Sequence, residues 1–260
     1  QHDPSFITLL NAFPLKPGDP LHHGQYETGK KSLLLALKNQ GYLDATYSVH
    51  RLRVDIAKQR ADIVLHLDMG RRYHIKTIRF QQDFLDEDLL TRYLPQQPEF
   101  PYTTKALLDI HSALTGSRYF DLVDIRPDLE AKDERQAIPV DILLRANASH
   151  YFSAGAGYGT DTGARISSEW QWRHLNRRGH DLTTTLNISQ LRADIAAAYT
   201  LPLERPQQEK LRFTLALQDE YGTDLPSSSL KLGLNRTHVF QWGSWPRPWI
   251  QKIGRASCRE

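Results

Sequence analysis

The second half of the sequence consists of short segments in which apolar and polar residues alternate, and this pattern most constrains the fold. In residues 164–173 the apolar side chains would share one face of an extended chain and the charged ones the other. The alternation returns in residues 181–189, 193–201 and 211–217, with turn residues between the segments. Each segment has roughly the 9 to 11 residues that a tilted strand needs to cross the hydrocarbon layer of a membrane. The pattern predicts an antiparallel sheet, either the wall of a transmembrane β-barrel or a soluble sheet with one wet face.

Aromatic residues near the ends of these segments favour the membrane barrel. Such residues form girdles where a barrel meets the two membrane interfaces. The phase of the alternation shifts near Arg236 and His238, so the sixth predicted strand has the least regular pattern of apolar and polar residues. The candidate membrane-interface aromatics are Trp170, Trp172, Tyr199, Phe240 and Trp242.

The composition agrees with a barrel and excludes other classes. Hydrophobic residues make up 40% of the chain and the mean hydropathy is -0.54, because polar residues that face a lumen dilute every strand of a barrel. No apolar run approaches the roughly 18 residues of a transmembrane helix. With 33 Lys and Arg against 30 Asp and Glu the net charge is +3. This charge is small and scattered, so nucleic acid is not an expected partner.

The sequence carries no pattern typical of an enzyme. Its histidines lack metal-ligand spacing such as His-Glu-x-x-His, and no Gly-x-Ser-x-Gly nucleophile elbow occurs. Asp86, Glu87 and Asp88 stand where a helix begins, so the helix dipole explains them. Cys258 is the only cysteine, which excludes an intrachain disulfide. We predict no catalytic residue, no metal site and no cofactor.

Residues before the alternating segments contain a repeat of the order strand, helix, helix, strand, strand. Gly41-Tyr42-Leu43-Asp44 ends a helix in the first copy, and residues 118–121 match it in the second. Gly41 can adopt the left-handed conformation that ends a helix, so this motif is interpreted first as structural. The exposed edge of each closing strand pair is the better binding candidate, by strand addition. In the first copy we expect a helix at 25–39 and strands at 45–54 and 61–67. In the second we expect strands at 73–80, 122–129 and 137–145 and helices at 85–94 and 103–114.

The first alternating segment, residues 151–160, differs from the others because glycine occupies every second position of one face. Gly155, Gly157 and Gly159 leave that face nearly bare. Glycine in a strand permits sharp bending or the close approach of another group. No strand-to-helix context and no Lys-Ser or Lys-Thr follows, so a phosphate-binding loop is excluded. Curvature at a barrel corner and an exposed pairing edge remain as alternatives.

A further set of short motifs runs along nearly the whole chain: Asp3-Pro4, residues 14–21, Tyr26-Glu27, residues 41–45, residues 155–163 and residues 175–182. In this order they resemble the TamA branch of the BamA superfamily. The repeats are similar to POTRA domains of that family, and the stretch that follows resembles the start of its barrel.

The resemblance implies α+β POTRA repeats followed by roughly the first six strands of a sixteen-stranded antiparallel transmembrane barrel. It implies a truncated POTRA domain at residues 1–70, which lacks its first strand, a second POTRA domain at 71–147, and the start of the barrel at 148–251. With the POTRA domains in the periplasm, residues 160–163 and 219–228 would be outer loops. Residues 176–180 and 203–209 would be periplasmic turns, with Gly179 in a left-handed conformation.

The resemblance also implies a function in the bacterial outer membrane. The protein would assist the insertion of unfolded outer-membrane clients, autotransporters especially, next to outer-membrane lipid, and its POTRA domains would bind a periplasmic TamB-like subunit. Its first barrel strand would be the lateral gate. A two-partner secretion transporter of the same superfamily and a periplasmic scaffold that never meets lipid remain as alternatives. The candidate gate residues are Phe152, Ala154, Gly155, Ala156, Gly157, Tyr158 and Gly159.

Both ends of the sequence suggest a piece of a longer protein. No signal peptide opens the chain, although an outer-membrane protein requires one. Residues 252–260, with the sequence KIGRASCRE, break the alternating pattern and resemble translated adaptor sequence. We expect this tail to be non-native, and the source DNA beyond the codon for Gln251 tests that expectation.

Overall fold

The computed structural model describes residues 13–160, 163–221, 226–240 and 249–259. The chain divides into two compact units. The first contains residues 1–79, 97–109 and 125–141, and the second contains residues 80–96, 110–124 and 142–260. The domain boundaries predicted after residues 70 and 147 stay predictions.

The first repeat consists of helix α2 (His23–Asn39) and the antiparallel strands β1 (Thr46–Asp55) and β2 (Arg60–Asp68). Tyr26, Leu33 and Leu37 are buried on one side of α2. The helix ends where Gly41 adopts a φ of +98°, and the Tyr42 amide donates to the Leu37 carbonyl at 3.1 Å. This is a Schellman-type end, so the prediction that Gly41 ends the helix in a left-handed conformation is confirmed.

The second repeat has the predicted order of elements. It contains β3 (His74–Gln81), α3 (Glu87–Thr91), α4 (Thr104–Gly116), β5 (Phe120–Pro127) and β6 (Ala137–Ala146). A two-residue strand, β4 (Phe100–Pro101), was too short to predict, and the sheet order is β4-β3-β6-β5. Helix α3 is shorter than the predicted 85–94, because the amides of Tyr93 and Leu94 donate to the Leu90 and Thr91 carbonyls in tighter i→i+3 turns, and Pro95 disfavours helical backbone at Leu94. Along β6, alternate residues are buried at no more than 4% exposure: Ile138, Val140, Ile142 and Leu144.

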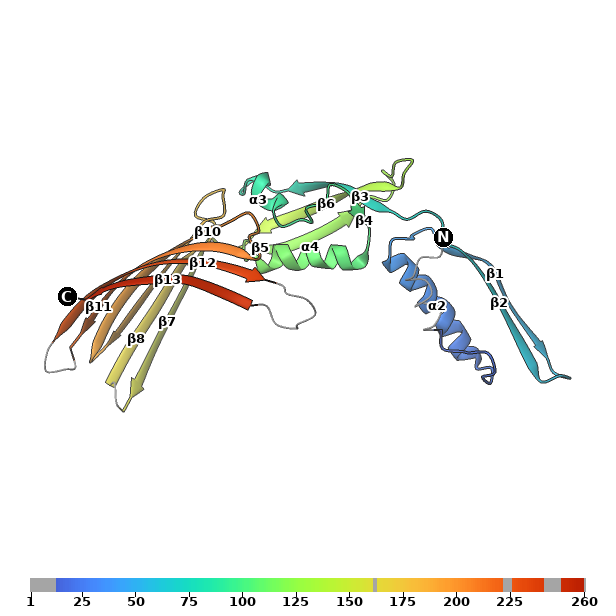
Figure 1. The fold of residues 1–260 in the computed structure, drawn as a ribbon, viewed down its shortest axis with the longest axis horizontal. Helices are drawn as coiled ribbons and strands as arrows, with labels where there is room; N and C mark the ends of the chain where they lie inside the picture. Colours follow the sequence, from blue (N-terminus) through green and yellow to red (C-terminus); the bar gives the residue numbers. More distant parts are fainter. Residues whose placement is uncertain (1–12, 161–162, 222–225, 241–248, 260) are drawn as a thin grey trace. The chain divides into compact units, whose positions relative to one another are not determined.

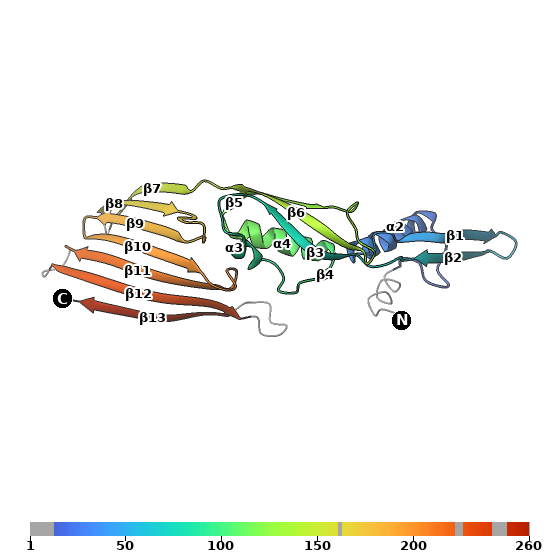
Figure 2. The same cartoon turned by 90° about the horizontal axis from the view of Figure 1, so that it is seen from above.

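The remaining described residues form a seven-stranded antiparallel sheet in the second unit, in which each strand pairs with its neighbours in sequence (Figures 1 and 2). The predicted strand ranges are close to those observed, which begin and end within a few residues of them. The strands are β7 (His150–Gly159), β8 (Gly163–Trp172), β9 (Asp181–Ser189), β10 (Arg192–Pro202), β11 (Glu209–Glu220), β12 (Ser227–Phe240) and β13 (Trp249–Arg259).

The seventh strand differs from the expectation of six. Strand β13 includes most of the tail that we expected outside the strand pattern, and it pairs with β12 from Phe240↔Trp249 to Ser229↔Arg259. Edge pairing uses backbone groups and requires no alternation of side chains. The irregularity predicted near Arg236 coincides with a register shift between Gly233 and Arg236 in this pair. That the tail is non-native stays a prediction.

Candidate functional site

One face of the sheet is apolar across the strands whose side chains the structure describes, β7 to β12. Ile195, Leu217 and Leu230 lie directly opposite one another on three neighbouring strands. On the same face Leu215 is 47% exposed and Leu232 is 56% exposed. An apolar surface of this extent requires cover by lipid or by another protein.

The opposite face is polar and small. Asn187, Asp194 and Gln218 form a row across β9, β10 and β11, with Ser167 and Ser229 at its two ends. Near the middle of the strands this face carries residues without bulk, namely Ala196, Ala198, Thr214, Ala216 and Gly233. The prediction of a two-faced sheet is confirmed, and a barrel wall has these two faces.

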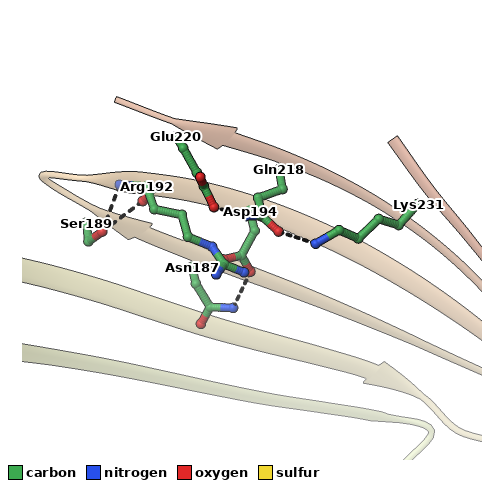
Figure 3. Close-up of polar contacts among 7 residues, drawn as sticks. All are labelled: Asn187, Ser189, Arg192, Asp194, Gln218, Glu220 and Lys231. Carbon is green, nitrogen blue, oxygen red and sulfur yellow. Dashed lines mark hydrogen bonds and ion pairs between the residues drawn. The ribbon is translucent and has the colours of Figure 1, made fainter. Parts of the chain in front are cut away.

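Two polar clusters lie side by side on this face near the β9–β10 hairpin, one joining β9 to β10 and the other joining β11 to β12 (Figure 3). Asp194 accepts hydrogen bonds from Asn187 Nδ2 at 2.8 Å and from Arg192 Nε at 3.0 Å. Lys231 donates to the side chain of Gln218, which in turn donates to Glu220. Arg192 and Lys231 therefore have acceptors within the sheet, and the bonds that cross between strands, from Asn187 to Asp194 and from Lys231 to Gln218, stabilise the register.

Strand β7 forms one edge of the sheet, since β8 is its only strand neighbour in the described part of the chain. The candidate gate residues Phe152, Ala154, Ala156 and Tyr158 lie on the apolar face, where Phe152 is 68% exposed and Tyr158 is 77% exposed. The candidate glycines lie on the polar face. The unpaired edge of β7 presents backbone groups that can pair with another strand.

The glycines of β7 make room for side chains of β8. A Cβ atom added to Gly157 would lie 3.1 Å from Arg165 Nε and 3.8 Å from Arg165 Nη2. A Cβ atom added to Gly155 would lie 3.1 Å from Ser167 Oγ. Neither glycine has a positive φ. The glycines thus permit the close approach of β8 side chains without an unusual backbone conformation. Curvature at a barrel corner and an exposed pairing edge stay open as predictions.

Three of the five candidate interface aromatics lie at the end of the strands near residues 173–180. The Trp170 ring stacks on His150 with centroids 5.8 Å apart, and the Trp170 and Trp172 centroids are 6.0 Å apart. Tyr199 makes an edge contact with His180. The side chain of Phe240 and all of Trp242 lie outside the described residues. The interface role of these residues stays a prediction.

The turn between β8 and β9 is held by local hydrogen bonds. Gly179 has a φ of +70°, which confirms the predicted left-handed position. Asn176 Oδ1 accepts from the amides of Arg178 at 3.0 Å and His180 at 3.3 Å. Burial, and then the nearby Arg178 charge, lower the pKa of His180. The imidazole is therefore neutral at pH 7, with Nδ1 2.5 Å from Tyr199 Oη.

Within the second unit, this turn contacts residues of the second repeat. Tyr119 Oη donates to the Gly179 carbonyl at 2.6 Å, and the Asp86 amide donates to the Arg177 carbonyl at 2.8 Å. Burial raises the pKa of Tyr119 to about 12, so its hydroxyl remains a donor at physiological pH. At the next turn on the same side, Gln207 Nε2 donates to the Tyr93 carbonyl at 3.2 Å. Both turns are therefore anchored by side chains or backbone of the repeat.

Replacing Tyr119 with phenylalanine is expected to loosen the turn at residues 176–180. The Gly179 carbonyl is buried and would lose its donor, which costs about 1–3 kcal/mol. Hydrogen exchange of the full-length protein measures this loss at the turn. Tyr158→Phe removes an exposed hydroxyl and serves as the control. Equal protection in the two variants would show that the Tyr119 bond does not hold the turn.

Arg165, Tyr119 and the polar clusters near the β9–β10 hairpin were not predicted as functional residues. Arg165 is one of several charged residues on the polar side of an alternating segment, and the pattern does not distinguish it from the others. Tyr119 lies in a motif that we interpreted as structural. In the described residues no group of three metal-ligating side chains gathers, and no helix is long and apolar enough to cross a membrane.

Comparison with known proteins found both sequence and structural likeness, although no family model matches the sequence. The chain is 22% identical over 194 residues to the outer membrane protein assembly factor BamA of Buchnera aphidicola subsp. Acyrthosiphon pisum (strain APS), covering 74% of this chain and 31% of that protein. The crystal structure of BamA from Haemophilus ducreyi lacking POTRA domains 1–3 matches with a TM-score of 0.71 at 17% identity, over 92% of this chain and 46% of that one. CdiB from Acinetobacter baumannii matches with a TM-score of 0.51 at 15% identity, over 92% of this chain and 47% of that one. The chain thus spans about a third of the curated relative and about half of each solved structure.

Proposed function

We propose that this chain, which is similar to BamA in sequence and in fold, is part of an outer-membrane protein assembly factor of the TamA type. Its sheet belongs to the outer membrane and its POTRA domains to the periplasm. The observation that carries the proposal is the glycine-lined strand β7, which has β8 as its one strand neighbour in the described residues and begins a sheet with one apolar face. An edge of this kind can receive a strand of an incoming protein.

The proposed step is the addition of a client strand to the sheet, and it involves no covalent chemistry. A client segment pairs through its backbone with the free edge of β7, which satisfies the N–H and C=O groups that lipid cannot satisfy. Phe152 and Tyr158 would continue the apolar face toward lipid. The homologues are assembly and transport proteins, and they support this type of activity over catalysis.

The POTRA domains are the proposed binding site for a periplasmic TamB-like subunit. Strand β5 ends the order of its four-stranded sheet, and β1 has β2 as its strand neighbour in the described residues. Each therefore offers an edge to which an extended segment can add by backbone hydrogen bonds. Autotransporters are the proposed client class.

Photo-cross-linking from Ala154 or Ala156 in the full-length protein tests the proposed gate. A client that is being assembled should form adducts at both positions, because both lie in the edge strand. The same probe at Ala197, in the interior strand β10, is the matched control and should give none. Intact barrels without client adducts at β7 would contradict the gate.

A two-partner secretion transporter is the second candidate, and the fold likeness to CdiB motivates it. Such a protein would pass an extended polypeptide through the lumen, along the polar face of the sheet with its small side chains, instead of releasing it through the gate into the membrane. Probes at Thr214 and Ala216 on that face distinguish the two functions. Adducts there, without adducts at Ala154 and Ala156, would favour transport through the lumen.

A further inference from the structure

Arg165 is a cation in β8, next to the edge strand β7 of the described sheet. It lies on the polar face of β8, opposite Gly157 on one side and Ser189 on the other. Its side chain is exposed, and it makes no hydrogen bond or ion pair within the described residues. Arg192 and Lys231 lie on the same face, near the β9–β10 hairpin, and their side chains instead have acceptors in the sheet.

The position of the Arg165 guanidinium depends on glycine in β7. Since Nε and Nη2 lie 3.1 Å and 3.8 Å from the place of a Gly157 Cβ, the guanidinium lies over the β7 backbone. A strand added to the free edge of β7 would lie about 4.8 Å beyond it. Side chains directly opposite across a strand pair have Cβ atoms about 4.5–5.5 Å apart. A carboxylate on the added strand, opposite Gly157 and on the polar face, would therefore reach the guanidinium.

We propose that Arg165 selects client strands that carry an acidic side chain on the polar face opposite Gly157. The inference rests on the proposed gate at β7 and specifies the chemistry of its client. An arginine that pairs with a carboxylate can form two parallel hydrogen bonds. Such a pair would attract the client strand and would also fix its register against β7. The charge would thus set which residue of the client stands opposite Gly157, a choice that the uniform backbone pairing of β7 cannot make.

The test uses the full-length protein in lipid vesicles and synthetic ten-residue strand peptides. The peptides are identical except for one polar-face position that carries Glu, Gln or Lys, and this position is moved along the peptide. A photo-cross-linker at Ala156 reports the adduct. We expect the Glu peptide to give about two- to fivefold more adduct than the Gln peptide at one position, as for a partly exposed ion pair. Salt should reduce the difference.

Variants of Arg165 separate charge from folding. Arg165→Gln should remove the preference for Glu over Gln, Arg165→Lys should retain part of it, and Arg165→Glu should prefer the Lys peptide. Heat-modifiable mobility of each variant verifies that its barrel is folded. Equal yields of Glu and Gln adducts in the natural protein, or a preference that survives Arg165→Gln, would overturn the inference while leaving the gate intact.

Two further results would overturn it for other reasons. If no peptide forms an adduct although the barrel is folded, the proposed gate fails and the inference fails with it. If the probe at Ala156 captures only a strand of the protein's own barrel, the occupant of the edge is not a client.

Discussion

Replacing Gly41 with alanine is expected to lower the free energy of unfolding of the first repeat by about 2–5 kcal/mol. Gly41 has a φ of +98°, and left-handed backbone costs a residue with a Cβ about 1–2 kcal/mol. The added Cβ would also clash with the Tyr102 carbonyl oxygen, and overpacking of this kind costs about 1–3 kcal/mol. The backbone cannot move away freely, because the Gly41 carbonyl accepts from the Tyr73 amide at 2.9 Å.

Two other glycines separate these contributions. Gly18 has the same φ of +98° but nothing within 4 Å of an added Cβ, so Gly18→Ala should show the backbone cost alone. Gly24 lies in α2 with open space around it, and Gly24→Ala should be neutral or stabilising by up to about 1 kcal/mol. Hydrogen exchange of α2 in the full-length protein measures all three. A Gly41→Ala variant as stable as Gly24→Ala would show that Gly41 is not tightly packed against the Tyr102 carbonyl.

Replacing Leu215 with arginine is expected to destabilise the folded barrel by about 2–4 kcal/mol, the cost of arginine on a lipid face near the bilayer midplane. Leu215 lies near the middle of β11 and is 47% exposed on the apolar face. Urea titration of the full-length protein in vesicles, followed by heat-modifiable mobility, measures the loss.

Thr214→Arg is the matched control, because the neighbouring residue of the same strand lies on the polar face. It should change stability far less, since a lumen-facing charge remains hydrated. Equal losses in the two variants, or no loss in either, would show that the apolar face does not meet lipid. That result would revive the periplasmic scaffold as the explanation of the sheet.

Local patterns predicted the elements of the fold because each depends on neighbouring residues. The alternation in residues 181–189 marks β9 to the residue, and Gly41 and Gly179 both have the predicted left-handed conformation. Helix α3 was predicted too long and β4 was missed, since a two-residue strand exists only by pairing with β3. The tail residues of β13 were placed outside the strands because backbone pairing at an edge leaves no side-chain pattern.

The candidate site was predicted only in part. Sequence alone pointed to the glycines of β7, since every second residue of one face lacks a side chain. It did not indicate that Arg165 occupies the space over Gly157, because that contact depends on which residues of β7 and β8 stand opposite each other.

Residue periodicity alone predicted repeats of mixed helices and strands followed by a sheet with one apolar and one polar face. Those properties follow from periods of two and of about 3.6 residues, which can be recognised within a short stretch of sequence. Contacts between distant residues had to come from the folded chain, as in the bond from Tyr119 to Gly179, 60 residues apart. The tertiary structure also left the edge of β7 with one strand neighbour in the described chain and placed Arg165 beside it. The register of a strand pair and the position of a sheet edge depend on which distant segments pair with each other, so no single segment of sequence specifies them.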